Sequence, residues 1–308
     1  MELIKLSLSS KGLNYFDLGK LVLTIGEFDG IHQAHKKLIE KVIAKANEKN
    51  LKSAVITFFP HPAYVLGKRK DDGYITTFDQ KVSILEKMNL DYLIVVEFSV
   101  ELSRLVYQDF ESHILDLFDI DTIICGFDFR YGFKGEGNYF TLKEKYNVEY
   151  FEKIELDDEK ISSTIIREAL KDGNMEKVKN YLGRNYSLKG KVVSGNQVGS
   201  KIGLATANLV FDNEFYNFLP GVYSTYVYVE GKKYLGVCNI GHNPSFNYVS
   251  DLSVEVHILD FDKVIYDQII EIEFVHYLRG EKTFSSPEEL MKQIEKDIKI
   301  TKELLWKE

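Results

Sequence analysis

The stretch LVLTIGEFDGIHQAH, residues 21–35, decides the fold of the first half of the chain. Residues 21–26 form a short apolar run of the kind found in buried strands, and a polar stretch with helical periodicity follows from 33 to 49. Glycines at 26 and 30 permit a tight turn between the two segments. The stretch therefore predicts a strand, a turn and a helix, the unit from which parallel sheets are built.

The same alternation of strand-like and helix-like segments continues downstream. We expect strands at 53–59, 92–98, 122–127 and 148–154, and helices at 77–88, 107–118, 163–171 and 174–182. The strands are continuously apolar, which indicates a parallel sheet covered by helices on both faces. Such sheets bind ligands at the carboxyl ends of their strands. The first half is therefore expected to be a Rossmann-like α/β domain.

From about residue 187 the pattern changes to β-rich stretches separated by glycines. We expect strands at 222–229, 233–240, 253–261 and 269–278, with a hairpin turn at Glu230 and Gly231 and an amphipathic helix at 286–305. This pattern predicts a small antiparallel β-barrel with a C-terminal helix. We accordingly divide the chain into domains of residues 1–185 and 186–308.

Composition excludes several classes of protein. The 308 residues carry a net charge of -8, which argues against nucleic-acid binding by neutralisation of phosphates. No run approaches the ~20 apolar residues that span a bilayer, and the N-terminus lacks the apolar region of a signal peptide. Cys125 and Cys238 stand in apolar runs without C-x-x-C spacing, so we expect two buried, reduced thiols. These features predict a cytoplasmic globular protein that binds neither nucleic acid nor a membrane.

Two segments have the chemistry of a phosphate site. His32 and His35 are three residues apart at a predicted helix start, where free N–H groups and positive potential suit a triphosphate. Taken alone, the two histidines would also suit surface polar groups. A zinc site is a further alternative, but the sequence offers no convincing additional ligands for it. The segment ISSTIIR, residues 161–167, offers hydroxyls and an arginine at another helix start, which suits either phosphate binding or an ordinary N-cap. The chain contains no P-loop of the form G-x-x-x-x-G-K-[ST].

Together, residues 26–35 and 161–167 resemble the two signatures of the nucleotidylyltransferase superfamily, G-x-F-D-x-x-H-x-G-H and I-S-S-T-x-x-R. The only departure is Ala34, where the family usually has glycine. The resemblance implies an ATP site made of Gly26, Phe28, Asp29, Gly30, His32, His35, Ser163, Thr164 and Arg167. Of these, His32, His35 and Arg167 would be catalytic.

Two further segments, TFFPHP (57–62) and GFDFRYG (126–132), resemble the flavin-site motifs of bacterial FAD synthetases. They imply an FMN site at Pro60, His61, Asp128, Phe129 and Arg130. The phenylalanines alone would also suit core packing.

The second half resembles the riboflavin kinases. The stretch GNQVGSKIGLATAN, residues 195–208, is similar to a glycine-rich flap followed by G-x-P-T-A-N, and matches at 220–223, 239–246, 254–257 and 278–284 follow in order. The resemblance implies an ATP site at Gly195, Gly199, Lys201, Gly203, Thr206 and Asn208, with Mg²⁺ held by Thr206 and Asn208. It also implies riboflavin contacts from Asn239 and Arg279, and a general base in Glu255. By pattern alone, Glu255 would equally suit a solvent-facing strand position.

The whole chain thus resembles the bacterial bifunctional riboflavin kinase/FMN adenylyltransferases. The resemblance implies that ATP phosphorylates riboflavin to FMN and that a second ATP adenylylates FMN to FAD, releasing pyrophosphate. Ala205 stands in place of the kinase proline, Asn243-Pro244-Ser245-Phe246 in place of R-P-T-F, and Ser200-Lys201 in place of a flap arginine. These departures leave open a transferase-only enzyme with a degenerate or flavin-sensing C-terminal half. A flavin- or nucleotide-binding regulator without activity is disfavoured, because both nucleotidyl signatures are retained.

Overall fold

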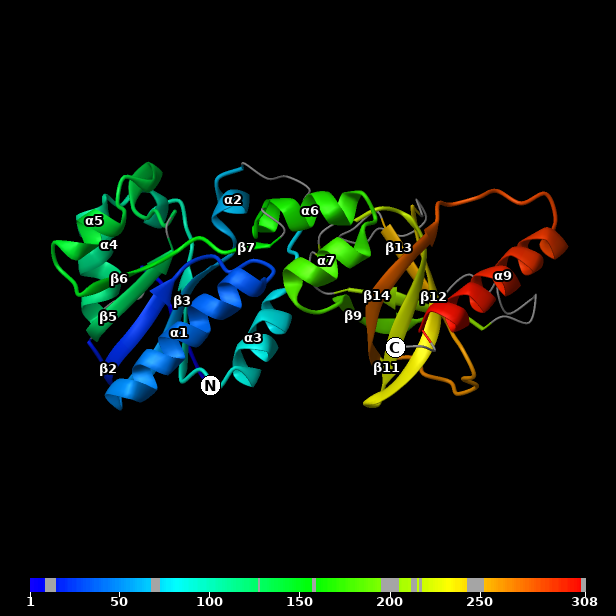
Figure 1. Cartoon of the computed structure of the whole chain (residues 1–308), viewed down its shortest axis with the longest axis horizontal. Coiled ribbons are helices and arrows are strands. Elements are labelled where there is room, and N and C mark those ends of the chain that lie inside the picture. Colours follow the sequence, from blue (N-terminus) through cyan, green and yellow to red (C-terminus); the bar gives the residue numbers. More distant parts are fainter. Residues whose placement is uncertain are drawn as a thin grey trace. The chain divides into compact units, whose positions relative to one another are not determined.

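The computed structural model describes residues 1–8, 15–67, 73–126, 128–156, 159–194, 205–211, 215, 218–242 and 252–305. The chain forms two compact units, one of Met1–Asp72 with Thr76–Ser162 and one of Gly73–Ile75 with Ser163–Glu308. Figure 1 shows both units, with elements labelled where there is room. The boundary predicted at residue 185 states which segments should fold on their own. The division into units by contacts does not test this, so the boundary stays a prediction.

The first unit is built on a six-stranded parallel sheet in the order β1-β4-β3-β2-β5-β6. Its strands are β1 (Glu2–Leu6), β2 (Phe16–Ile25), β3 (Lys52–Phe59), β4 (Tyr92–Glu97), β5 (Phe118–Gly126) and β6 (Val148–Phe151). The chain reverses its direction of travel across the sheet between β2 and β5. A reversal of this kind is where open α/β sheets bind ligands.

Helices cover both faces of this sheet, as predicted. One apolar cluster joins the sheet to α1 (Gln33–Lys49) and α3 (Phe78–Lys87), and a second joins it to α4 (Tyr107–Ile114) and α5 (Tyr139–Lys143). The short α2 (Pro62–Val65) follows β3. The helix α1 has the predicted bounds because its apolar residues recur at helical spacing, and it ends at Asn50, whose φ of 55° is left-handed.

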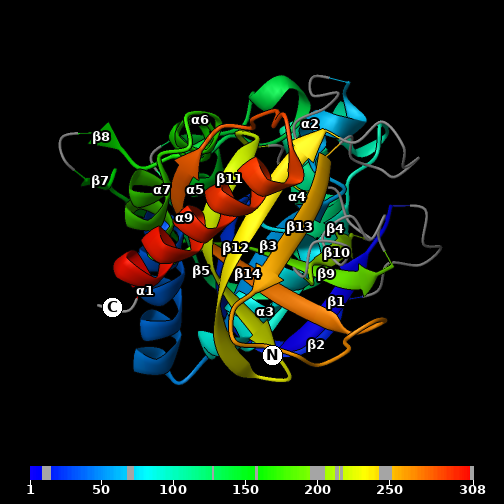
Figure 2. The same cartoon turned by 90° about the vertical axis from the view of Figure 1, so that its right-hand side faces the viewer.

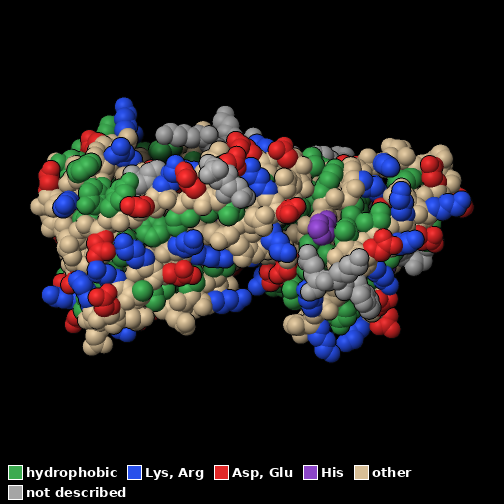
Figure 3. Space-filling view, in the orientation of Figure 1, with side chains coloured by type: hydrophobic (Ala, Val, Ile, Leu, Met, Phe, Trp, Pro, Cys, Tyr) green, Lys and Arg blue, Asp and Glu red, His purple; other side chains and the backbone are tan. Residues whose placement is uncertain are grey.

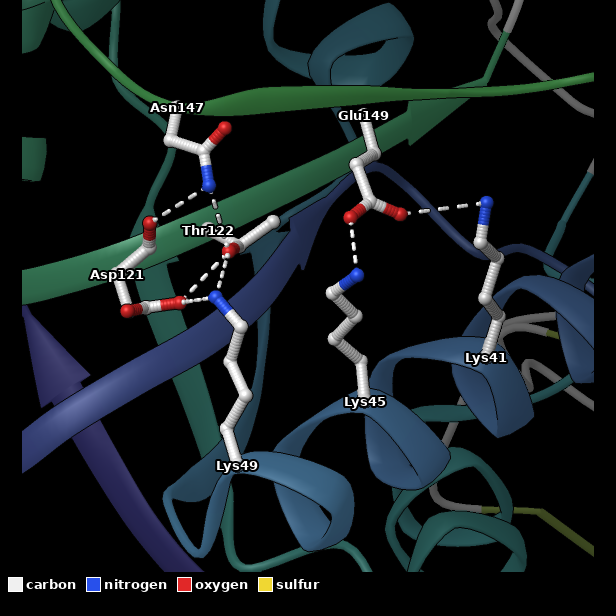
Figure 4. Close-up of polar contacts among 7 residues, drawn as sticks. All are labelled: Lys41, Lys45, Lys49, Asp121, Thr122, Asn147 and Glu149. Carbon is white, nitrogen blue, oxygen red and sulfur yellow. Dashed lines mark hydrogen bonds and ion pairs between the residues drawn. The ribbon is translucent and has the colours of Figure 1, made fainter.

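A row of lysines joins α1 to the strands β5 and β6 (Figure 4). Lys45 Nζ lies 2.5 Å and Lys41 Nζ 3.5 Å from the Glu149 carboxylate, and Lys49 pairs with Asp121. Partly exposed pairs of this kind contribute only about 0–1 kcal/mol each, so the row fixes the direction of α1 more than it stabilises the unit. The direction matters because the N-terminus of α1 carries the predicted phosphate site.

The structure differs from the sequence-based prediction at a few elements. The predicted helix at 107–118 ends at Ile114, and a 3₁₀ turn leads into β5 at Phe118. The edge strand β1 and the small hairpin of β7 (Glu155–Leu156) and β8 (Glu159–Lys160) were not predicted. In β1 only Ile4 and Leu6 are buried, so the strand lacks the continuous apolar run of its neighbours.

The second unit contains the predicted closed antiparallel barrel, in the order β10-β13-β12-β11-β14-β9. It consists of β9 (Tyr186–Val193), β10 (Ala207–Val210), β11 (Gly221–Val229), β12 (Lys232–His242), β13 (Leu252–Ile258) and β14 (Ile269–Arg279). Two helices, α6 (Ser163–Lys171) and α7 (Met175–Leu182), precede it. The C-terminal helix α9 (Pro287–Leu305) packs against β11 and β12 (Figure 2).

Local signals in the barrel behave as the sequence indicates. Glu230 and Gly231 both adopt positive φ angles, 50° and 77°, which is the geometry of a tight hairpin turn. At the start of α9, the Ser286 hydroxyl accepts the N–H of Glu289 at 3.2 Å. Both cysteines are buried and unpaired, as expected.

The surface carries charges of both signs. On the face shown in Figure 3, lysine and arginine side chains are interspersed with aspartate and glutamate. Among the described residues, no helix is long and apolar enough to cross a membrane.

Candidate active sites

The loop between β2 and α1 is held in an unusual backbone conformation. Phe28, Gly30 and Ile31 have positive φ angles of 49°, 85° and 38°. For Phe28 and Ile31 this conformation is unfavourable, but both side chains are buried and packing retains them. A Cβ on Gly26 would lie 3.1 Å from the Phe28 ring, so glycine leaves room for that ring.

His32 and His35 lie side by side at the start of α1, as predicted. His32 is the N-cap, and its Nδ1 accepts the backbone N–H of His35 at 3.3 Å. The two rings stack with centroids 3.5 Å apart. Burial, the His32 ring and the Lys81 ammonium together hold the pKa of His35 well below 6.5. Since Nδ1 of His32 is an acceptor, its neutral ring carries the proton on Nε2, and the pair can donate hydrogen bonds to an anion.

Two buried charged residues, Asp29 and Lys81, hold this loop in place through hydrogen bonds. Asp29 Oδ1 accepts the N–H of Thr76 at 3.4 Å. Lys81, in α3, donates to the Glu27 carbonyl oxygen at 2.6 Å and to the Thr57 hydroxyl at 3.3 Å. Lys81 was not predicted from the sequence, because a lysine in an amphipathic helix normally lies on its solvated face.

The predicted flavin residues of the first unit follow β3 and β5, the two strands that flank β2. His61 caps α2 by accepting the N–H of Ala63 at 3.0 Å. Asp128 pairs with Lys160 at 2.6 Å, and Phe129 stacks on Tyr131 with centroids 5.5 Å apart. Pro60 and Arg130 are exposed, and Phe127 lies outside the described residues. Because the strands are parallel, these segments leave the same edge of the sheet as the histidine pair.

The remaining predicted nucleotide residues lie on α6. Ser163 and Thr164 occupy its first turn, and Arg167 follows one turn later. By its contacts, this helix clusters with the second unit. That these residues act together with the histidines stays a prediction.

In the barrel, cross-strand register places four predicted residues in one row. Asn208 lies opposite Glu255, and Glu255 lies opposite Asn239. Asn239 lies opposite Val222, which in turn lies opposite Arg279. Directly opposed residues share a face of the sheet, so all five lie on the same side. Thr206, two positions before Asn208, belongs to that side as well.

All members of this row except Asn208 line a cavity of about 370 Å³, a size typical of small-molecule sites. Its lining is Thr206, Val222, Val237, Asn239, Glu255, His257, Arg279, Glu281, Lys282, Phe284, Leu290, Ile294 and Asp297. Burial raises the pKa of Glu255 above 4.5, which makes its carboxylate a better proton acceptor near neutral pH. The cavity therefore combines an apolar wall with a basic carboxylate.

Arg279 is fixed at the rim of the cavity by Asp297, which was not predicted from the sequence. Its Nε and Nη2 donate to the same oxygen of Asp297, at 3.0 and 2.8 Å. Gln293 donates to the other oxygen at 2.8 Å. Asp297 is only 2% exposed, yet in the sequence it is one of many charged residues of an amphipathic helix. The pair gives the arginine a single orientation towards the cavity.

Comparison with known proteins agrees with this geometry. A family model for FAD synthetase matches residues 17–165, and one for riboflavin kinase matches residues 182–305. The chain is 36% identical to the bifunctional riboflavin kinase/FMN adenylyltransferase of Listeria monocytogenes, over 93% of this chain and 92% of that protein. It is 37% identical to the Bacillus subtilis enzyme of the same name, over 90% of each. The chain belongs to this family.

As a bifunctional riboflavin kinase/FMN adenylyltransferase, the protein acts on flavins with ATP as co-substrate. The transferase-only alternative is not favoured, since the riboflavin kinase model spans the whole barrel. A solved structure described as a macrolide-efflux protein from Streptococcus pneumoniae has the same fold. It is 28% identical, covers 97% of this chain and 99% of its own, and has a TM-score of 0.86.

The kinase barrel has a second cavity of about 190 Å³, which shares Thr206 with the first. Its lining is mostly apolar, with Val192, Ala205, Ala207, Val256, Ile258, Phe261, Val264, Ile265 and Tyr266 beside Asp262 and Lys263. The His257 ring nitrogen lies 2.8 Å from the Ala205 carbonyl oxygen and ties this segment to β13. The predicted flap residues Gly195, Gly199, Lys201 and Gly203, and the segment Asn243–Phe246, lie outside the described residues.

Proposed function

We propose that riboflavin binds in the larger barrel cavity and that Glu255 is the general base of its phosphorylation. The observation that carries this proposal is the row in which Glu255 lies between Asn208 and Asn239, at the border of a cavity with an apolar wall. The wall suits the flavin ring, and Asn239 and Arg279 supply polar contacts at its rim. Glu255 would accept the proton of the ribityl 5′-hydroxyl as its oxygen attacks the γ-phosphorus of ATP and ADP leaves.

The smaller cavity suits the adenine of ATP. It is mostly apolar, and it meets the larger cavity at Thr206, so phosphates between the two would reach the hydroxyl of riboflavin. Thr206 and Asn208 offer a hydroxyl and an amide oxygen, the hard donors that Mg²⁺ prefers. These two side chains would share Mg²⁺ with the phosphates, whose oxygens are ligands of the same kind. Bound there, Mg²⁺ would neutralise phosphate charge.

For the adenylyl transfer, we propose that the α1 N-terminus and the two histidines hold the triphosphate of a second ATP. The pKa of His35 is low and His32 presents Nε2–H, so the pair would act as neutral donors to phosphate oxygens. We also propose, from the resemblance of residues 161–167 alone, that Ser163, Thr164 and Arg167 bind ATP in this reaction. The FMN phosphate is already ionised near neutral pH, so its oxygen can attack the α-phosphorus without a protein base while pyrophosphate leaves.

The FMN of that reaction would lie where β3 and β5 end, against Pro60, His61, Asp128, Phe129 and Arg130. The support is positional, because these strands flank β2 and parallel strands end at one edge. A cytoplasmic location remains part of the proposal, and two unpaired thiols agree with a reducing compartment.

One experiment tests both assignments. The protein is incubated with riboflavin, ATP and Mg²⁺, and the flavins are separated by chromatography. The wild type should yield FMN and FAD, Glu255→Gln should yield neither from riboflavin, and His32→Ala should accumulate FMN. FAD formation by His32→Ala at the wild-type rate would refute the adenylyl site, and FMN formation by Glu255→Gln at the wild-type rate would refute the kinase site.

A further inference from the structure

Lys81 is a buried lysine that holds two neighbouring segments, the loop that leads to the histidine pair and the strand β3. Its side chain is 5% exposed, and its ammonium donates to the Glu27 carbonyl at 2.6 Å and to Thr57 Oγ1 at 3.3 Å. Thr57 in turn donates to the same carbonyl oxygen at 3.2 Å. Burying an ammonium is costly, and an apolar residue would fill this position in α3 at lower cost. A role beyond packing would account for the lysine.

The Glu27 carbonyl connects Lys81 to the histidines through a short path. A peptide group is planar, so holding this carbonyl fixes the plane of the Glu27–Phe28 peptide and with it the start of Phe28. Phe28 is held at a φ of 49°, and its ring meets the His35 ring edge-on with centroids 5.1 Å apart. The His35 ring stacks on His32. A shift of the carbonyl would therefore be transmitted to both histidines.

Charge provides a second connection. Burial lowers the pKa of the Lys81 ammonium, and the Asp29 and Glu27 carboxylates oppose this effect by favouring its ionised form. On the other side, the Lys81 ammonium helps to hold the pKa of His35 below its usual range, after the larger effects of burial and His32. The ammonium thus favours the neutral form of His35 and adds positive potential to a site for polyphosphate.

We propose that Lys81 is a positioning residue for FMN adenylylation, whose ammonium holds the Glu27 carbonyl and thereby fixes residues 26–35 for the triphosphate of ATP. The inference rests on the adenylyl site proposed at His32 and His35. Lys81 acts through the loop and through His35, without touching the reacting atoms.

The test compares Lys81→Met, which removes the charge and the donor, with Lys81→Arg, which keeps both. Lys87→Met, an exposed position on the same helix, is the matched control. Losing a charge-assisted hydrogen bond should lower kcat/KM for ATP in FAD formation by about tenfold to a hundredfold. Lys81→Arg should recover part of this loss, and Lys87→Met should match the wild type. Riboflavin phosphorylation should stay within about twofold in all three variants, as a check on folding.

The effect of the Lys81 charge on His35 can be measured separately from the rate. Histidine NMR spectra of the free protein should show a higher pKa for His35 in Lys81→Met, since a neighbouring positive charge is gone. A wild-type pKa of His35 together with a wild-type rate overturns the inference. So does an equal loss of activity in folded Lys81→Met and Lys81→Arg. If Lys81→Met does not fold, Lys81→Gln takes its place, and equal rates in Lys81→Gln and Lys81→Arg overturn the inference.

His35→Ala separates this inference from the proposal on which it rests. Normal FAD formation by His35→Ala would remove the proposed site, and the role of Lys81 with it. Loss of FAD formation by His35→Ala, with a normal rate in Lys81→Met, would overturn the role of Lys81 alone.

Discussion

Replacing Glu255 by glutamine is the most informative single change in the kinase. Glutamine keeps the size and shape of the side chain that lies between Asn208 and Asn239 in the row. It removes the negative charge, and with it the ability to accept a proton. The change therefore isolates base catalysis from binding.

The expected loss can be estimated from the environment of the carboxylate. General base catalysis contributes about 10²–10⁴-fold, or about 3–5.5 kcal/mol of barrier. Burial raises the pKa of Glu255, which strengthens the base, so we expect a loss in the upper part of that range. The wild-type kcat/KM should fall as the pH is lowered through this raised pKa, and glutamine should abolish that limb.

The same burial predicts an opposite effect on stability. The folded state holds the proton of Glu255 more tightly than the unfolded chain, because its folded pKa is raised. The stability that this protonation provides is present below the unfolded pKa, near 4.5, and is lost as the pH rises through the folded value. At pH 7 the ionised carboxylate is thus unfavourable, and Glu255→Gln should raise the Tm of the kinase while lowering its rate.

The assay is initial-rate formation of FMN from riboflavin, with FAD formation from FMN as an internal control. Glu271→Gln, on β14 away from both cavities, is the matched control and should be unchanged. A kinase rate within about threefold of the wild type in folded Glu255→Gln would refute the role of general base. A fall in Tm at pH 7 would show that the carboxylate is instead a stabilising contact.

Further predictions concern both units. His32→Ala and Arg167→Ala should each greatly slow FAD formation from FMN and leave riboflavin phosphorylation nearly intact; normal rates in both would reject the assignment. Residues 186–308 alone should fold and phosphorylate riboflavin, and an unfolded circular dichroism spectrum would show that the boundary at 185 is wrong. Asp297→Ala leaves Arg279 without its buried partner and should lower the free energy of unfolding of the kinase, measured by chemical denaturation, by about 3–5 kcal/mol. A decrease below about 1 kcal/mol would contradict this. Between about pH 6 and 8, the rate of FAD formation should show no inflection caused by His35, since the pKa of His35 lies well below 6.5. An inflection in the wild type that disappears in His35→Ala would contradict this.

Most of the fold could be predicted because its signals are local. The helix α1 follows from apolar residues at helical spacing, and the turn at Glu230 and Gly231 follows from its dipeptide. The edge strand β1 could not be predicted in this way, because only one of its faces is buried.

The parts of the candidate sites that have local signals could likewise be predicted, and those that depend on distant residues could not. The segments that leave β2 and β5 were predicted from their resemblance to family motifs and from their place after apolar strands. The register that aligns Asn208, Glu255, Asn239 and Arg279 depends on pairing between distant strands, and alternation within one strand does not specify it. Lys81 and Asp297 were not predicted, because the sequence of an amphipathic helix does not show which of its charged side chains is buried.

The row across the barrel also restricts which length changes the kinase can tolerate. Side chains alternate between the two faces of a strand, so one residue inserted before Glu255 in β13 would turn the carboxylate to the opposite face. The barrel is closed, and a slipped strand would disturb pairing with both of its neighbours. Insertions and deletions should therefore accumulate in the loops, while the strands β10, β12 and β13 keep a constant length from one relative to the next.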